Sequence, residues 1–301
     1  MADDIFPAYG KLLKRAREIA LLDSAGSLLS WDEETYLPAK ALEHRAAQMA
    51  YFSGQAHRLF TATKVGEWIA ACEQHGFAPD SDAAANVREW RRSYDRKPKI
   101  PARFVEKFQR VRAPAREAWG AARQESKFKI FRPHLQKLLD LHLQFADLWG
   151  YTGSPYNAHL DEYEPGARAE DLRELFAKLR PEIVAILGPA REHSAATPRT
   201  ILNGHYPVAA QQAFNREVAQ AMGFDFAAGR IDTTTHPFCT GLGPNDCRLT
   251  TRYNETDFTQ SLYGVMHEAG HGLYDQGLPK SHYGTPLGNA ISLGIHESQS
   301  R

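Results

Sequence analysis

The segment His267-Glu268-Ala269-Gly270-His271 has the pattern H-E-x-x-H. Apolar side chains recur around it at helical spacing and predict a buried helix from about Asp257 to Gln276: Phe258, Leu262, Val265, Met266, Leu273 and Tyr274. Residues four apart lie on one face of a helix, so the imidazoles of His267 and His271 can reach one cation. Glu268 is then placed to hydrogen-bond a water on that cation. The pattern therefore predicts a zinc site with Glu268 as the general base.

A third metal ligand is expected, because catalytic zinc commonly takes three protein ligands and leaves one position open. Glu297 lies 26 residues beyond His271, in a segment that can be helical, and it is the expected ligand. His296 is the alternative; neighbouring helical positions point about 100° apart, so both are not expected to bind one ion. Asp275 either hydrogen-bonds to a metal ligand or is a solvated carboxylate. Cobalt could replace zinc at such a site.

The rest of the sequence is mostly helical in pattern. Apolar residues recur at helical spacing near 8–29, 39–61, 63–73, 83–95, 101–119, 133–149, 169–187 and 208–222. Residues 152–166 are rich in Gly, Pro and Asn and predict a loop. Threonine-rich segments 230–238 and 246–253, with turn residues 241–245 between them, predict a β-hairpin. We expect one domain over 1–301, with a helical part (1–228), the hairpin (229–254) and metal-site helices (255–301).

Composition and charge narrow the class of protein. Lys plus Arg and Asp plus Glu both count 36, and this balance lacks the basic footprint of a general nucleic-acid binder. The three cysteines, Cys72, Cys239 and Cys247, show no C-x-x-C spacing, so neither a disulfide framework nor a thiolate zinc site is indicated. Cys239 and Cys247 could lie near each other in the hairpin. Without a secretory pattern or a long apolar run, we expect a soluble, cytoplasmic protein that makes no membrane contact.

Four motifs between Thr233 and Arg301 resemble, in order, signatures of the Taq-type thermostable metallocarboxypeptidases (family M32). Residues 267–277 resemble the family's metal-binding helix, and residues 296–301 resemble its second signature, whose Glu is the third zinc ligand. His236-Pro237-Phe238 is similar to its H-P-F motif, and Asp246-Cys247-Arg248-Leu249-Thr250 is similar to its D-x-R-x-T motif. The resemblance implies a mainly α, two-lobed helical clamp around a deep cleft, with a small sheet beside the zinc helix.

The same resemblance implies a zinc-dependent carboxypeptidase. Such an enzyme removes single residues from the free C-terminus of a peptide, through attack of a zinc-bound water assisted by Glu268. We expect substrate contacts from His236, Asp246, Arg248 and Thr250. Their structural alternatives are a fixed strand end for His236 and a salt bridge within the hairpin for the others. A homodimer is also implied.

The resemblance also bears on the length of the chain. Members of the family continue for roughly two hundred further residues, about one more domain. The chain is therefore expected to be incomplete at its C-terminus, which leaves its activity on its own open.

Two other functions fit the sequence. The first is another zinc peptidase with two histidines and one glutamate, acting as an aminopeptidase or an endopeptidase. The second is a non-catalytic, truncated fragment that binds zinc. Peptides blocked at one end separate the peptidases, because a carboxypeptidase needs a free C-terminus and tolerates a blocked N-terminus.

Overall fold

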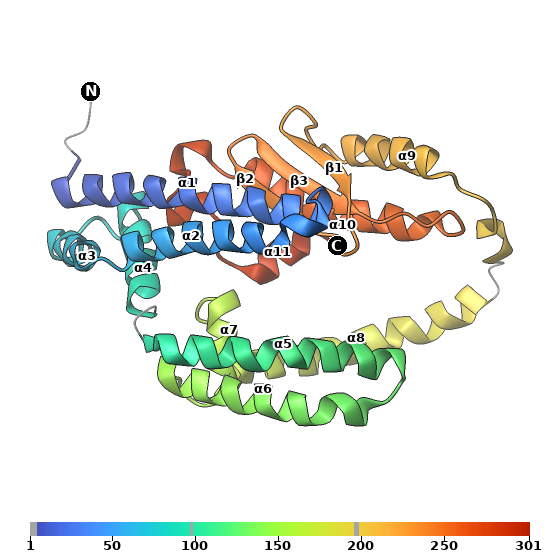
Figure 1. Ribbon diagram of the computed structural model, residues 1–301, viewed down its shortest axis with the longest axis horizontal. Coiled ribbons are helices and arrows are strands. Elements are labelled where there is room, and N and C mark those ends of the chain that lie inside the picture. The colour runs from blue at the N-terminus through green and yellow to red at the C-terminus, as the bar shows by residue number, and fades with distance from the viewer. Residues whose placement is uncertain (1–4, 97–98, 196–198) are drawn as a thin grey trace. The chain divides into compact units, whose positions relative to one another are not determined.

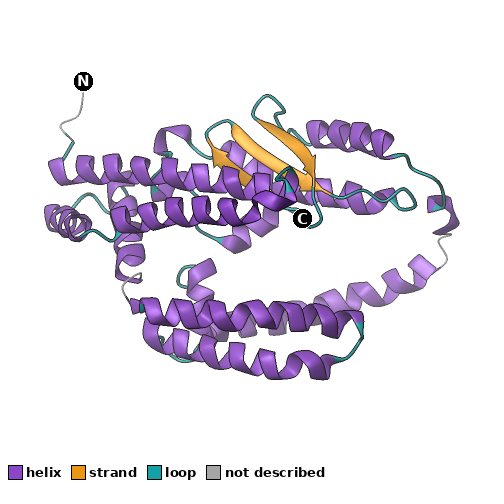
Figure 2. Cartoon of the chain, in the orientation of Figure 1, coloured by secondary structure: helices purple, strands orange, loops and turns teal. Residues whose placement is uncertain are grey.

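A computed structural model describes residues 5–96, 99–195 and 199–301 (Figure 1). The chain divides into two compact units, one made of Met1–Arg91 with Glu182–Arg301 and the other of Arg92–Pro181. Figure 2 shows helices over most of the described chain and one small sheet. The mainly α fold with a small sheet is therefore confirmed. The single-domain organisation and the clamp around a cleft stay predictions.

The first unit begins with three helices and most of a fourth, which continues past Arg91 into the second unit. These are α1 (Pro7–Thr35), α2 (Leu42–Phe60, preceded by a 3-10 turn at Ala39–Ala41), α3 (Thr63–His75) and α4 (Asp82–Arg96). Helices α1 and α2 run side by side (Figure 1). In α3 the buried residues Val65, Ile69 and Cys72 recur every three or four positions, so one face of that helix enters the core. The helix ends at Gly76, whose φ of 69° is a conformation that glycine adopts without strain.

The second unit contains α5 (Ala102–Gln124), α6 (Phe128–Trp149) and α7 (Tyr156–Tyr163), and it ends within α8 (Ala169–Ala195). Helix α7 lies inside the predicted loop 152–166, so that prediction is wrong there. Asn157 explains the difference: it is buried, donates to the Thr152 carbonyl at 2.9 Å and accepts from the Ala169 amide at 2.7 Å. These bonds from one side chain to backbone groups on either side of α7 hold a short helix that has no apolar period of its own.

The sheet has three strands, β1 (Gly229–Thr233), β2 (Cys239–Gly243) and β3 (Asp246–Thr251), in the order β1-β3-β2. Strand β2 pairs with β3 in antiparallel register, whereas β1 pairs with β3 in parallel register. The predicted hairpin between 230–238 and 246–253 is therefore wrong in its pairing, because the hairpin partner of β3 is β2. Pro237 contributes to the break between β1 and β2, since proline has no N–H for a strand ladder.

Helix α10 (Phe258–Gly277) packs on this sheet and on α9 (Val208–Ala221). The predicted boundaries of α10 agree to within one residue. Its N-terminus is capped by Asp257, whose carboxylate accepts from the Thr259 amide. The core beneath the sheet contains Ala219, Phe224, Cys247, Leu249, Val265 and Ala269. Helix α11 (Leu293–Gln299) then packs on α10, which places the two C-terminal motifs side by side.

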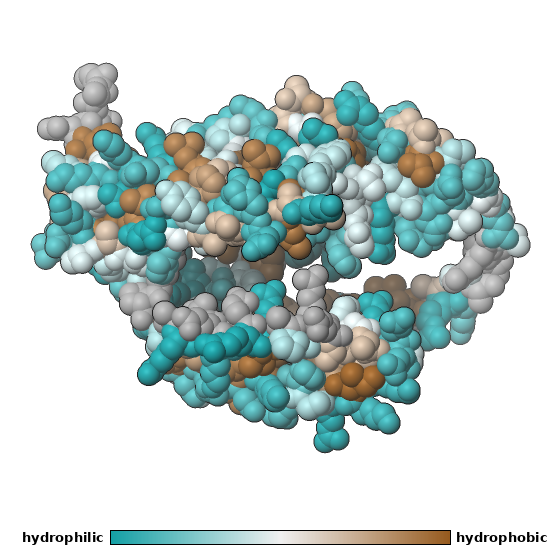
Figure 3. All heavy atoms as spheres, viewed as in Figure 1, coloured by the Kyte–Doolittle hydropathy of each residue, from teal (hydrophilic) through white to brown (hydrophobic). Residues whose placement is uncertain are grey.

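The surface of the described chain is mainly polar. Figure 3 shows hydrophilic residues over most of the visible face, with apolar residues in small groups. Among the described residues, no helix combines the length and the apolar character that crossing a membrane requires.

Candidate metal centre

The three predicted metal ligands converge at the contact between α10 and α11. The Oε2 atom of Glu297 lies 4.0 Å from Nε2 of His267 and 3.7 Å from Nε2 of His271. One ligand atom from each of the three residues lies within 4.8 Å of the others. The two imidazoles come from successive turns of α10, as the spacing predicts, and the carboxylate comes from α11. The structure therefore brings His267, His271 and Glu297 together.

Ser300, just after α11, orients two of these side chains. Its carbonyl oxygen lies 3.1 Å from Nδ1 of His267, and a proton on Nδ1 leaves the Nε2 lone pair directed toward Glu297. The Ser300 hydroxyl donates to Glu297 Oε2 at 2.8 Å. This hydrogen bond is the largest of several influences that lower the pKa of Glu297, so its carboxylate is ionised at neutral pH. Sequence reasoning missed Ser300, because nothing local to it indicates a contact with a residue 33 positions earlier.

Gly270 permits this contact. A Cβ atom at Gly270 would lie 2.0 Å from the carbonyl oxygen of Gln299 and 2.7 Å from Cα of Ser300. Both distances are far below van der Waals contact, and both neighbours are backbone atoms. The end of α11 can therefore approach α10 only because this position of the H-E-x-x-H segment has no side chain.

Glu268 lies beside the three converging side chains and is buried, with 6% of its surface exposed. Burial raises the pKa of its carboxyl group, and the nearby Glu297 carboxylate raises it further. Its electrostatic interaction with His267 and a hydrogen bond from the Cys239 backbone lower it, but the net shift of the pKa is upward. A carboxylate of raised pKa is a stronger base than an exposed glutamate, which suits general-base chemistry.

His271 and His296 form a stacked pair behind the centre. Their ring centroids lie 4.5 Å apart with 23° between the planes, and His296 Nε2 lies 3.3 Å from Asp275 Oδ1. Of the predicted alternatives for the third ligand, Glu297 therefore faces the histidines of α10, whereas His296 faces Asp275. Burial and His296 lower the pKa of His271, which favours its neutral form. In the described part of the chain, His271 Nδ1 is buried without a hydrogen-bond partner.

The residues at this centre fit a zinc ion. Two neutral imidazole nitrogens and one carboxylate oxygen are an established set of catalytic zinc ligands. Tetrahedral ligands at 2.0–2.1 Å from zinc lie about 3.3 Å apart. The observed separations of 3.7 and 4.0 Å would have to contract by about 0.4 and 0.7 Å. The half-exposed Glu297 side chain can supply that movement.

The residues predicted to contact substrate have partners within the protein. Arg248 donates to both oxygens of Asp246, at 2.9 and 3.0 Å, and its guanidinium lies 4.2 Å from the ring centroid of Trp31. Thr250 is fully buried, and its hydroxyl accepts from the Phe238 amide and donates to the Phe238 carbonyl. His236 is exposed. A role of His236, Asp246, Arg248 and Thr250 in substrate binding stays a prediction.

Known proteins resemble the chain over nearly all of its length. It is 42% identical to thermostable carboxypeptidase 1 of Thermus thermophilus over 305 residues, which covers 98% of this chain and 60% of that protein. A crystal structure of an M32 carboxypeptidase from Deinococcus radiodurans R1 superimposes with a TM-score of 0.89 at 36% identity, over 98% of this chain and 59% of that one. The structure of a Pyrococcus furiosus carboxypeptidase gives a TM-score of 0.90 at 29% identity, over 98% and 60%.

The curated relatives are longer than this chain, which spans 57% to 60% of their length. Residues 11–301 match the family of carboxypeptidase Taq (M32) metallopeptidases. The match includes the helix with His267 and His271 and the helix with Glu297. The chain therefore belongs to the carboxypeptidase Taq (M32) metallopeptidase family.

Proposed function

We propose that this chain carries the zinc centre and the general base of a metallocarboxypeptidase that removes single residues from the free C-terminus of peptides. The observation that carries the proposal is the convergence of His267, His271 and Glu297 beside the buried Glu268. Membership of a metallopeptidase family implies a metal ion, and several relatives are named carboxypeptidases. Zinc is the proposed metal because of the ligand set, and cobalt is a substitute with the same ligand preference.

The proposed reaction is hydrolysis of the last peptide bond. A bound zinc ion would polarise the scissile carbonyl and lower the pKa of a water molecule at the centre. Glu268 accepts the proton of the attacking water and passes it to the leaving amine. Ser300 keeps His267 in the tautomer whose Nε2 is free, and its hydroxyl keeps Glu297 ionised. These contacts place the ligands before substrate arrives, which lowers the cost of reaching the transition state.

The remaining predictions belong to the same proposal. His236, Asp246, Arg248 and Thr250 remain the predicted substrate contacts. Of these, His236 is exposed, whereas Arg248 donates to Asp246 and the Thr250 hydroxyl donates to the Phe238 carbonyl. The resemblance to the family supports a homodimer. A cytoplasmic location stays a prediction from the sequence.

Mass spectrometry of an N-terminally blocked peptide incubated with the zinc-loaded protein tests the proposal. We expect stepwise loss of C-terminal residues by the parent and no loss from a peptide amidated at its C-terminus. A Glu268→Gln variant should still bind one zinc ion at this centre but cleave about 10²- to 10⁴-fold more slowly, the usual contribution of a general base. Cleavage of the amidated peptide would instead indicate an endopeptidase or an aminopeptidase. Zinc binding without any cleavage would indicate a non-catalytic metal site.

A further inference from the structure

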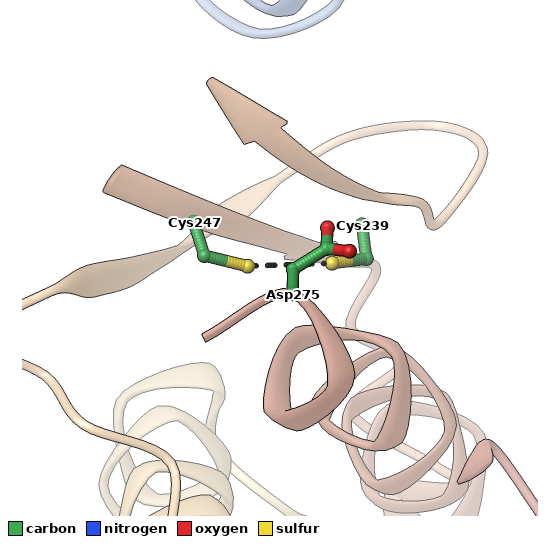
Figure 4. A group of neighbouring side chains, drawn as sticks. All are labelled: Cys239, Cys247 and Asp275. Carbon is green, nitrogen blue, oxygen red and sulfur yellow. Dashed lines mark hydrogen bonds between the residues drawn. The ribbon is translucent and has the colours of Figure 1, made fainter. Parts of the chain in front are cut away.

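A second cluster of metal-ligating side chains lies on the sheet side of α10. It consists of Cys239 on β2, Cys247 on β3 and Asp275 on α10, and Figure 4 shows the carboxylate reaching from the helix toward the two sulfur atoms. The sulfur atoms lie 3.6 Å apart, and one carboxylate oxygen lies within 4.8 Å of both. We propose that these three residues form a second cation site, selective for a thiophilic divalent ion such as Zn²⁺ or Cd²⁺.

The register of the sheet places both thiols on the face that α10 covers. Cys239 lies opposite Leu249, and Gly241 lies opposite Cys247, so the two cysteines are diagonal neighbours on one face of the hairpin. Leu249 and Cys247 both belong to the core beneath that face. A Cβ atom at Gly241 would lie 2.8 Å from Asp275 Oδ2. A side chain at position 241 would therefore crowd the carboxylate in its observed position beside the thiols.

The spacing of the sulfur atoms suits a metal ion. Zinc–sulfur bonds of about 2.3 Å place two tetrahedral thiolate ligands roughly 3.8 Å apart. The observed 3.6 Å is close to that value, so the spacing between the two sulfur atoms need hardly change when an ion binds. A disulfide, by contrast, would require the two atoms to approach to about 2.05 Å. The third ligand would be the Asp275 carboxylate and the fourth a water molecule, since Cys239 and Asp275 are only partly buried.

The chemistry of the cluster selects the class of ion. Soft thiolate ligands favour zinc, cadmium and similar ions over magnesium or calcium, which prefer oxygen. Without an ion the Cys239 thiol is protonated, because the contact with Cys247 and burial raise its pKa. Binding would release both thiol protons and form two metal–sulfur bonds and one metal–oxygen bond. His296, within hydrogen-bond distance of Asp275, orients that carboxylate.

A cadmium titration of the reduced, metal-free protein tests the site, because thiolate ligands give an ultraviolet sulfur-to-cadmium charge-transfer absorption that imidazole and carboxylate ligands do not. We expect the parent to bind two Cd²⁺ ions, with the absorption complete after one of them. A His271→Ala variant should bind one ion fewer and keep the absorption, so failure of the centre on α10 and α11 is distinguishable from failure of this site. A Cys72→Ser variant serves as the thiol control and should match the parent.

Cys239→Ser and Cys247→Ser variants should each lose most of the absorption and one bound ion, and Asp275→Asn should weaken binding at least tenfold. Cys239 is only partly buried, so its replacement gives the test even if replacement of the buried Cys247 prevents folding. Circular dichroism would establish that each variant is folded. The proposal is overturned if the folded, reduced parent shows no thiolate absorption with Cd²⁺. It is equally overturned if the absorption survives in the Cys239→Ser variant.

Discussion

Replacement of Gly270 by alanine is expected to damage the proposed metal centre while leaving α10 folded. The new Cβ atom would lie 2.0 Å from the Gln299 carbonyl oxygen, and a carbon–oxygen contact needs about 3.2 Å. The end of α11 must therefore move away from α10 by about 1.2 Å. Both helices have backbone atoms at this contact, so no side-chain rotation can absorb the change. The helix itself should tolerate alanine, which has a higher helix propensity than glycine by about 1 kcal/mol.

The displacement would act on the groups that orient the metal ligands. Glu297 lies two residues before Gln299, and Ser300 lies next to it, so both the third ligand and the partner of His267 would shift. Loss of hydrogen bonds that support metal ligands commonly weakens metal binding by about 10- to 100-fold. A misplacement of about 1 Å at a reacting centre can cost roughly 10²-fold in rate. We therefore expect at least tenfold weaker zinc binding and about a hundredfold slower peptide cleavage.

Zinc affinity would be measured by competition with a chromophoric chelator at fixed pH, with circular dichroism as the check on folding. The matched control is Gly277→Ala, which makes the same change on the same helix at a position where a Cβ atom would have no neighbour within 4 Å. This control should bind zinc as tightly as the parent. If a folded Gly270→Ala variant also binds zinc as tightly as the control, the close approach of α11 does not determine the geometry of the centre.

Two further predictions concern stability. Thr250→Val removes the buried hydroxyl that bonds to the amide and carbonyl of Phe238. The free energy of unfolding, measured by urea denaturation, should fall by about 1–3 kcal/mol. Thr251→Val loses one long 3.5 Å hydrogen bond and should lower it by less; an equal loss would contradict this account. Burial raises the pKa of Glu268, so its stabilising contribution is present below the ordinary value of about 4.5 and is lost as pH rises through the higher folded pKa. The metal-free Glu268→Gln variant should therefore melt at a higher temperature than the metal-free parent at pH 7 to 8, by a margin that shrinks toward pH 4.5; a constant margin would argue against the raised pKa.

Local sequence patterns were enough to predict the part of the site that lies on α10. His267 and His271 are related by one turn of a helix, and the apolar residues around them set the buried face of that helix, so their common orientation follows from spacing alone. Glu268 follows from the same pattern. The position of Glu297 could not be predicted in this way, because its distance from His271 along the chain does not determine where α11 packs. The ligand set and the resemblance of the second motif favoured it over His296, and the structure places it facing both histidines.

Other features depended on contacts between distant segments. The predicted loop 152–166 contains α7 because buried Asn157 bonds to backbone groups at Thr152 and Ala169. The strand that pairs with β3 in the hairpin is β2, and no alternation of residues distinguishes it from β1. The contacts of Ser300 with His267 and of Asp275 with His296 likewise join residues more than 20 positions apart.

Three features follow from the amino-acid pattern alone: the helical character of the chain, the pair of histidines with the proposed base Glu268 between them, and the family to which these motifs point. These features follow from relations between residues three or four apart, which the backbone geometry of a helix translates directly into a shared face. The strand order, the place of Glu297 and Ser300 beside the two histidines, and the thiol pair beside Asp275 become visible only in the folded chain. Their positions follow from packing between segments distant in sequence, and that packing cannot be predicted from local periodicity.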